Sequence, residues 1–279
     1  MRINDRVSLR WVRNLTANAA PVADAVIATS VQTAEAVSLW PSQCGAKFYF
    51  VQGYEKWDFP EARVHASWRL PFRKIAISRW LCALIEKAEA SAEYLPNGLD
   101  QNAFGVDVEP EGRAPCLLWP HHRLAFKGSA DVLRAILGLN GVDICSFGTG
   151  SPPRSDRMSI SYFRNPSQCE LRELYNRASV FIAPSHSEGW GLPACEALQC
   201  GCALAASDIG GHREFLRDEQ NALLHEPGRV EQLRQNIQRL LSDARLRSRL
   251  SSTGIADMAK LRVESSAARL DEILLTAIR

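Results

Sequence analysis

The stretch SHSEGWGLPACEAL at residues 185–198 decides the predicted fold, together with the apolar run ASVFIAP that precedes it at residues 178–184. The apolar run predicts a buried strand of a parallel sheet. The turn after it has a glycine on each side of Trp190, and Pro193 suits the first turn of a helix expected at residues 192–200. Glycines let backbone N–H groups approach a ligand, and a helix that begins at the carboxyl end of a strand is typical of a phosphate site.

Two acidic residues, Glu188 and Glu196, bracket this turn with seven residues between them. Carboxylates placed there can accept hydrogen bonds from sugar or ribose hydroxyls while backbone amides hold phosphates. Taken alone, Glu196 would be interpreted as a first-turn acid that the helix dipole favours. The coincidence of loop glycines, a helix start and two spaced acids favours a ligand site.

The segment SEGWGLPACEALQCG at residues 187–201 resembles the E-x7-E signature of retaining GT-B glycosyltransferases, specifically glycosyltransferase family 4. The resemblance covers about residues 20–275, and some segments resemble bacterial members near the rhamnosyltransferases of surface-polysaccharide synthesis. The further segments that carry it are YFVQGYEKWDFP (49–60), YLPNGLD (94–100), FGTGSPP (147–153), NPSQCELRELYNRA (165–178), ASDIGGHREF (206–215) and NALLHEPG (221–228).

Alternating strand and helix patterns predict an α/β protein with parallel sheets. Ser78 is the expected N-cap of the helix after the third strand, and residues 100–115 suggest a polar linker. Strands are expected within residues 22–30, 47–55, 73–80, 92–100, 114–120, 142–150, 158–165, 178–184, 202–211 and 222–227. Helices are expected within residues 32–40, 57–71, 81–90, 121–139, 169–178, 192–200, 229–251 (one or two) and 262–278, and Trp11 and Leu15 are spaced as one helical face.

The resemblance implies a GT-B fold, in which two Rossmann-like domains face a cleft. Residues 1–100 would form an acceptor-side domain, residues 101–262 the nucleotide-sugar domain, and residues 263–279 a helix that returns to the first domain. A complete acceptor domain of the family would have roughly six or seven strands in about 150 residues, whereas about four are expected here. The N-terminal domain is therefore expected to be incomplete, through truncation, a misassigned start or reduction of the enzyme.

The composition of the chain limits its possible ligands and its cellular location. The 279 residues carry a net charge of +2, which gives no overall case for nucleic-acid binding. Eight scattered cysteines without a CxxC pair indicate no zinc site and a reducing, cytoplasmic compartment. No signal peptide or membrane-spanning run is visible, although the Arg- and Trp-bearing residues 69–80 allow peripheral contact with the inner face of the plasma membrane.

Lys127 follows one predicted strand and is expected to open a helix, where it can neutralise a diphosphate. A solvated lysine is the alternative, but the helix dipole makes that position unfavourable. The family has an Arg-x-x-x-x-Lys pattern here, and Arg123 lies one residue too close, so His121 or His122 could line the site instead.

Gly148, in FGTG, ends another predicted strand, but Pro152 and Pro153 cannot continue into the helix of a dinucleotide-binding fingerprint, which excludes NAD. The resemblance puts this loop near the nucleotide, with a plain turn as an equal alternative. By the same resemblance, Arg164 would stack on or hydrogen-bond the base. His186 and His212 are expected to be ordinary loop histidines.

The function implied is retaining, metal-independent transfer of a hexose or deoxyhexose from a nucleoside diphosphate sugar to a glycan or lipid-linked acceptor, without a cofactor. Lys127 would stabilise the leaving diphosphate, and Glu188 would contact the donor sugar. The alternative is a non-catalytic nucleotide-sugar-binding subunit, or a truncated remnant, that needs a partner for the acceptor half; sugar-phosphate or trehalose-type synthesis is less favoured. The donor-binding residues would be Glu196, which holds the ribose, with Gly189, Trp190, Gly191, Leu192, Arg123, Gly148 and Arg164.

Overall fold

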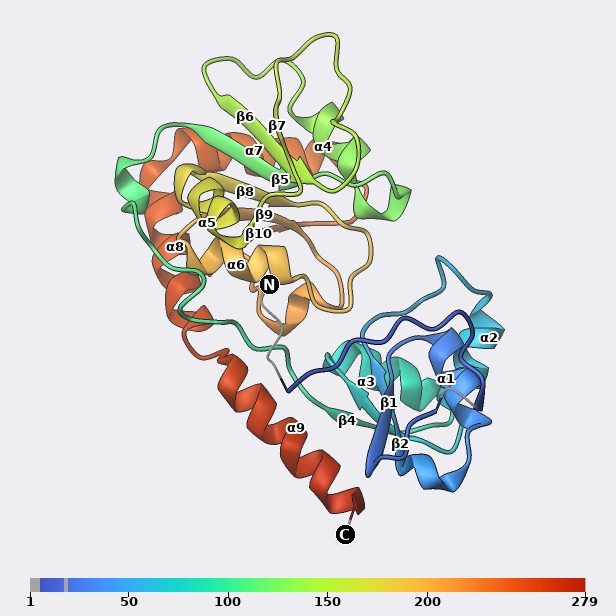
Figure 1. Cartoon of the computed structure of the whole chain (residues 1–279). Coiled ribbons are helices and arrows are strands. Elements are labelled where there is room, and N and C mark those ends of the chain that lie inside the picture. The colour runs from blue at the N-terminus through green and yellow to red at the C-terminus, as the bar shows by residue number, and fades with distance from the viewer. Residues whose placement is uncertain (1–5, 18–19, 279) are drawn as a thin grey trace. The chain divides into compact units, whose positions relative to one another are not determined.

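The computed structural model describes residues 6–17 and 20–278, which fall into two units. The N-terminal unit comprises residues 1–96 and 264–279, and the C-terminal unit comprises residues 97–263. Each unit has one parallel sheet with helices packed on it (Figure 1). The predicted α/β class with parallel sheets is therefore confirmed.

The N-terminal unit has a four-stranded sheet in the order β1-β2-β3-β4, and all its strand pairs are parallel. Ser78 is the N-cap of the third helix, as predicted, because its Oγ accepts a hydrogen bond from the Leu81 N–H at 3.2 Å. The elements are β1 (Ala25–Ala28), α1 (Val31–Ser38), β2 (Ala46–Val51), α2 (Glu61–Trp68), β3 (Arg73–Ala76), α3 (Arg79–Lys87) and β4 (Ala92–Tyr94).

The last helix, α9 (Val263–Ile278), packs in the N-terminal unit although it comes last in the chain (Figure 1). Ile273 is buried and joins the core around Phe48, Ile75 and Leu95. Burial of such side chains contributes roughly 1.5–3 kcal/mol each, so this helix is held mainly by its apolar face.

Residues 6–16 form neither a helix nor a strand, so the helical spacing of Trp11 and Leu15 is misleading. Both side chains are exposed, and a short helix without tertiary contacts is only marginally stable in water. No helix in residues 6–17 and 20–278 combines the length and the apolar character needed to cross a bilayer.

The C-terminal unit has a six-stranded parallel sheet in the order β10-β9-β8-β5-β6-β7. Its core is formed by strand residues such as Leu117 and Ile182 and by helix residues such as Leu233 and Leu240. The strands are β5 (Cys116–Pro120), β6 (Asp143–Gly148), β7 (Ser161–Arg164), β8 (Val180–Ala183), β9 (Ala203–Ser207) and β10 (Leu223–His225). The helices are α4 (Ser129–Ala135), α5 (Gln168–Arg177), α6 (Leu192–Gln199), α7 (Val230–Ser242) and α8 (Ala244–Met258).

This strand order contains a topological switch point. The chain runs from β5 outward through β6 and β7, and then returns to β8 on the opposite side of β5. The loops after β5 and β8 therefore leave the same edge of the sheet in opposite directions. Ligands of open α/β sheets bind at such a point, so these two loops are the place to look for a site.

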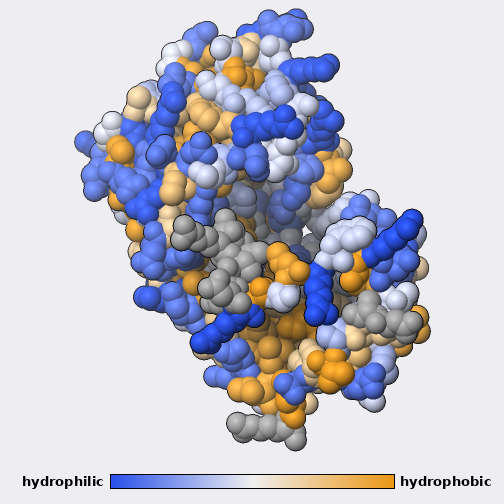
Figure 2. Space-filling model, in the orientation of Figure 1, coloured by the Kyte–Doolittle hydropathy of each residue, from blue (hydrophilic) through white to orange (hydrophobic). Residues whose placement is uncertain are grey.

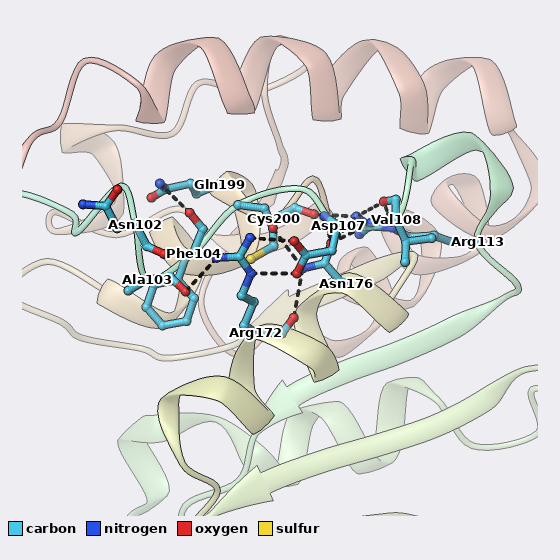
Figure 3. Close-up of polar contacts among 11 residues, drawn as sticks. Asn102, Ala103, Phe104, Asp107, Val108, Arg113, Arg172, Asn176, Gln199 and Cys200 are labelled. Atoms are coloured by element: carbon cyan, nitrogen blue, oxygen red, sulfur yellow. Dashed lines mark hydrogen bonds and ion pairs between the residues drawn. The ribbon is translucent and has the colours of Figure 1, made fainter.

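Residues 102–113 are docked on the C-terminal unit rather than forming the expected polar linker, and Figure 3 shows the contacts. The guanidinium of Arg113 is buried and donates to the carbonyl oxygens of Val108, Tyr175, Ala178 and Cys200 at 2.5–3.2 Å. It thereby satisfies carbonyl groups at the ends of both α5 and α6.

Two side chains of α5 also hold residues 102–113 in place (Figure 3). Asn176 accepts from the N–H groups of Asp107 and Val108, and Arg172 forms a bidentate pair with the Asp107 carboxylate. Helices α5 and α6 are thus fixed relative to each other, which matters because α6 follows the central strand β8.

Candidate functional site

The loops after β5 and β8 lie against each other at the switch point. The His186 N–H donates to the Phe126 carbonyl oxygen at 2.7 Å. Gly128 has φ +70°, and a Cβ there would lie 2.1 Å from the Pro184 carbonyl oxygen. Only glycine fits this position, and its close approach keeps the two loops together.

An ion pair joins these loops. Lys127 Nζ lies 2.7 Å from Glu188 Oε1, and Ser185 Oγ donates to the same oxygen at 2.8 Å. The two charged side chains are only 28% and 23% exposed. Among the described residues, none donates to Oε2 of Glu188, so half of this carboxylate is left to accept from a ligand.

Lys127 does not open a helix, which corrects the sequence-based expectation. It ends a short 3₁₀ helix, Ala125–Lys127, and α4 begins at Ser129 with Gly128 as its N-cap. The positive φ of Gly128 separates the two helices, and the lysine side chain is directed to Glu188 instead of to solvent.

The N-terminus of α6 has no side-chain cap. Its N-cap is Gly191, with φ +111°. Helix α5, in contrast, has a capping box formed by Ser167 and Glu170. Pro193 has no N–H, and the N–H groups of Ala194 and Cys195 donate to the Gly191 carbonyl oxygen. Among the described contacts, the N–H of the half-exposed Leu192 is therefore the first-turn donor left for a ligand, and the helix dipole favours an anion at this end.

The loop after β9 packs against the glycine turn and supports it. A Cβ on Gly211 would lie 2.5 Å from the Glu188 carbonyl oxygen and 2.8 Å from the Gly189 carbonyl carbon. His212 is buried, and its Nδ1–H donates to the Ser207 carbonyl oxygen at 2.8 Å. Burial lowers the pKa of His212 and keeps the ring neutral. This histidine is a buried support of the turn, not the ordinary loop residue that was expected.

Replacement of Gly191 by Ala is expected to destabilise the turn. The new Cβ would meet His212 Cδ2 at 2.8 Å in a backbone conformation that L-residues rarely adopt. We expect a loss of about 1–3 kcal/mol in the free energy of unfolding and weaker anion binding. Chemical denaturation measures the first effect. Gly112→Ala is the control, because a Cβ at that position would have no atom within 4 Å; equal stability of the two variants would contradict the account.

Glu196 lies in the second turn of α6, so it is not the first-turn acid of the alternative interpretation. Tyr175 Oη donates to Glu196 Oε2 at 2.9 Å, and burial raises the pKa of the Glu196 carboxyl. No described residue donates to its Oε1. Tyr175 itself is fully buried between Phe104, Phe147 and Phe181, which orients its hydroxyl. The sequence predicted a helix at residues 169–178, but nothing in it indicated the contact between Tyr175 and Glu196.

The Trp190 side chain belongs to the core. Its Nε1–H donates to Cys195 Sγ at 3.3 Å, and its ring stacks on Phe215 with centroids 5.7 Å apart. Only 3% of the residue is exposed, so its backbone is the part that faces the turn.

A second group of predicted residues lies at the ends of β6 and β7. Gly148 and Arg164 are register partners, and a Cβ on Gly148 would lie 2.4 Å from the His121 carbonyl oxygen. Arg123 donates to Ser151 Oγ at 2.6 Å, in the loop after β6. Arg123 and Arg164 are both exposed. Because all these strands are parallel, both groups of site residues lie at the carboxyl edge of one sheet.

Two further histidines lie near this edge and were not predicted to matter. His186 Nε2 lies 2.5 Å from the buried Asp131 carboxylate, and His225 Nε2 lies 3.4 Å from Ser207 Oγ. Within residues 6–17 and 20–278, no group of three His, Cys, Asp or Glu side chains could hold a metal ion.

His225 should make folding sensitive to acid. Burial lowers its pKa from 6.5 to about 4, so the unfolded chain binds a proton that the folded chain does not bind in this range. Stability is therefore complete above pH 6.5 and is lost as the pH falls toward 4, by at most about 3 kcal/mol. Urea denaturation across this range should show a smaller pH slope for His225→Gln. The exposed-histidine control His122→Gln should keep the wild-type slope, and an unchanged slope for His225→Gln would contradict the prediction.

Residues 158–257 match the family model "Glycosyl transferases group 1". This region includes the glycine turn, Glu188 and Glu196, but it begins after Lys127.

Curated relatives match over less than half of this chain. D-inositol 3-phosphate glycosyltransferase of Thermobispora bispora is 32% identical over 111 residues, which is 40% of this chain and 26% of that protein. The enzyme of the same name from Acidothermus cellulolyticus is 44% identical over 62 residues, or 21% of this chain and 14% of that protein. The aligned part thus spans about a quarter or less of these relatives.

Solved structures match over most of the chain. Sucrose-phosphate synthase from Thermosynechococcus elongatus superimposes with a TM-score of 0.79 at 18% identity, covering 91% of this chain and 73% of that one. Anabaena Alr3699/HepE in complex with UDP-glucose gives a TM-score of 0.79 at 15% identity, covering 91% and 79%. The chain therefore has the GT-B fold of these glycosyltransferase structures, as predicted, and a glycosyl transferases group 1 match in its C-terminal unit.

Proposed function

We propose that this chain is a retaining, metal-independent glycosyltransferase of family 4, close to the rhamnosyltransferase-like branch. In this proposal it transfers a hexose or deoxyhexose from a nucleoside diphosphate sugar to a glycan or lipid-linked acceptor in cell-surface polysaccharide synthesis. Residues 101–262 are the donor-binding domain. Its eight cysteines, none in a CxxC pair, favour a reducing, cytoplasmic location.

One observation carries the donor site: a lysine–carboxylate pair at the switch point, beside an uncapped helix N-terminus. Lys127 supplies positive charge to this region, and the backbone N–H groups of Gly189 to Leu192 would supply hydrogen-bond donors. In the free protein, Glu188 Oε1 lies 2.7 Å from Lys127 Nζ. A bound diphosphate would compete with this carboxylate for the lysine. Exchange of one anionic partner for another keeps the buried charge compensated.

The two glutamates have separate roles in this proposal. Glu188, in the loop, would accept from a hydroxyl of the donor sugar and support developing positive charge at the anomeric carbon. Glu196, one helical turn further from the loop, would accept from the ribose. Each carboxylate has one oxygen held by the protein and one without a described donor, which leaves that second oxygen to accept from ligand hydroxyls.

The positive charge and hydrogen-bond donors at this site suggest how the sugar would be transferred. As the glycosidic bond to phosphate breaks, negative charge grows on the leaving diphosphate, where Lys127 and the backbone N–H groups of Gly189 to Leu192 would stabilise it. In a retaining reaction the acceptor oxygen attacks on the face that the diphosphate leaves, and the departing phosphate can take the acceptor proton. This route uses no protein nucleophile.

The alternative function is a nucleotide-sugar-binding subunit that needs a partner for the acceptor. The observation that favours it is the four-stranded sheet of the N-terminal unit, against the larger acceptor domain that the family resemblance implies. Donor binding would be the same in both cases, so transfer to an acceptor by the chain alone would distinguish them.

Calorimetric titration tests the donor site. The panel would contain UDP, dTDP, GDP and ADP, their sugars and the matching nucleosides, beginning with uridine compounds because HepE was solved with UDP-glucose. Lys127→Ala should weaken diphosphate binding but not nucleoside binding, whereas Glu196→Ala should weaken both. Arg245→Ala, an exposed change on α8, is the charge control. Binding of no ligand, or equal loss in all variants, would contradict the proposed site.

Tyr175 should act as a positioning residue for Glu196. Tyr175→Phe removes only the hydroxyl that donates to Glu196 Oε2 at 2.9 Å. Binding would then have to immobilise the Glu196 side chain, which should weaken ligand binding by about 0.5–1.5 kcal/mol, roughly 2- to 12-fold in Kd. The loss should be equal for nucleoside and nucleoside diphosphate, because Glu196 would contact the ribose. A loss confined to the diphosphate would contradict this role.

A further inference from the structure

The chain exposes an apolar segment that the proposed donor site does not explain. In residues 6–15, here called the N-terminal arm, Trp11 is 88% exposed, Leu9 is 75% exposed and Val7 is 54% exposed. Val12 and Leu15 are each about two-fifths exposed. Single exposed apolar residues are ordinary, but five within ten residues form a surface that normally contacts another body.

The same arm is basic. It carries Arg6, Arg10 and Arg13 and contains no acidic residue, although the whole chain is almost neutral at +2. Arg10 and Arg13 are exposed, and neither forms an ion pair with any residue that the structure describes. The arm therefore presents apolar and cationic side chains together.

The arm is attached to the N-terminal unit. The Leu15 carbonyl oxygen accepts from Trp40 Nε1–H at 3.4 Å, just after α1, where Leu39 is 83% exposed. Figure 2 shows exposed hydrophobic residues beside strongly hydrophilic ones on this unit. The exposed apolar side chain of Leu39 extends the surface beyond the arm itself.

We propose that the N-terminal arm binds the surface of an anionic lipid bilayer. Tryptophan suits the bilayer interface because its ring is apolar and its N–H can reach polar groups. Leucine and valine can enter the boundary of the acyl chains, while arginines pair with anionic headgroups. A second copy of the chain fits less well, because pairing two arms would bring their arginines together.

In residues 69–80, the segment first expected to contact membrane, Arg69 and Arg79 are exposed but most apolar side chains are not. Phe72 is 6% exposed, and Ile75, Ala76 and Ile77 are buried in and after β3. The arm, by contrast, exposes apolar side chains together with its arginines. The inference does not depend on the donor site, so either proposal can fail without the other.

Vesicle co-sedimentation of the full chain tests the inference. The protein should bind vesicles of mixed phosphatidylglycerol and phosphatidylcholine, and binding should weaken at high salt. Arg10→Glu with Arg13→Glu should lower the partition coefficient by at least about 30-fold, since each basic residue near the surface contributes about fivefold. Leu9→Ser with Trp11→Ser should also reduce binding, because apolar burial is lost.

The matched control is Arg157→Glu with Arg245→Glu, which makes the same change in net charge at exposed positions of the C-terminal unit. It should bind vesicles like the wild type, and all variants should have wild-type circular dichroism because the changed side chains are exposed. Lack of binding by the wild type, equal binding to pure phosphatidylcholine, or equal loss in the control variant would each overturn the inference. So would gel filtration showing a dimer that Leu9→Ser with Trp11→Ser dissociates.

Discussion

Lys127→Ala is expected to lower kcat/KM for the sugar donor by about 10²- to 10³-fold. The substitution removes a cation from the place where the leaving diphosphate would develop charge. It also leaves the Glu188 carboxylate, now 2.7 Å from the lysine, without its charged partner in a partly buried position. Steady-state kinetics with the donor that calorimetry selects would measure the effect.

Two further variants show whether the effect depends on the charge and position of Lys127. Lys127→Arg keeps the positive charge and should recover part of the activity, although its planar fork cannot reproduce the geometry of an ammonium group. Lys260→Ala removes an equally charged but 75% exposed side chain of the same unit and should leave the kinetics unchanged. Wild-type kcat/KM in Lys127→Ala would contradict the proposed role.

Arg113→Ala is expected to lower the free energy of unfolding of the C-terminal unit by about 3 kcal/mol or more. The arginine is 7% exposed and donates to four carbonyl oxygens. Without it, the carbonyl oxygens of Tyr175 and Ala178 would keep, among the described residues, only the weak donor Cys202 Sγ. Because Arg113 joins the ends of α5 and α6, its loss should also disturb the contact between Tyr175 and Glu196. Urea denaturation followed by tryptophan fluorescence would measure the change.

An exposed arginine at the end of α5 supplies the control. Arg177 pairs with Asp143 at 2.8 Å, with both side chains more than half exposed. Surface pairs of this kind contribute about 0–1 kcal/mol, so Arg177→Ala should have a small effect. If the two variants were equally stable, the buried network of Figure 3 would not be what fixes the two helices.

The order of strands and helices was predictable because it rests on local patterns. The run at residues 178–184 is apolar almost throughout and forms the central strand β8, and Pro193 lies in the first turn of α6. The caps that local sequence specifies, such as Ser78, were also correct. Such features need only neighbours in the chain, so one sequence is enough to identify them.

Contacts between distant residues were not predictable in the same way. The hydrogen bond from Tyr175 to Glu196 depends on how α5 lies against α6, and the burial of Arg113 depends on both. Lys127 was singled out because it follows a predicted strand, where a lysine can neutralise a diphosphate, and because the family resemblance has a lysine there. Its pairing with Glu188 depends on the order of strands across the sheet, which no local pattern gives.

A crystal structure with the tightest-binding nucleoside diphosphate would test the central claim most directly. The account predicts that the diphosphate lies between the loops after β5 and β8, within hydrogen-bond distance of Lys127 Nζ and of backbone N–H groups in residues 189–192. It also predicts the ribose hydroxyls on Glu196. A diphosphate bound elsewhere, with the pair of Lys127 and Glu188 unchanged, would contradict the account.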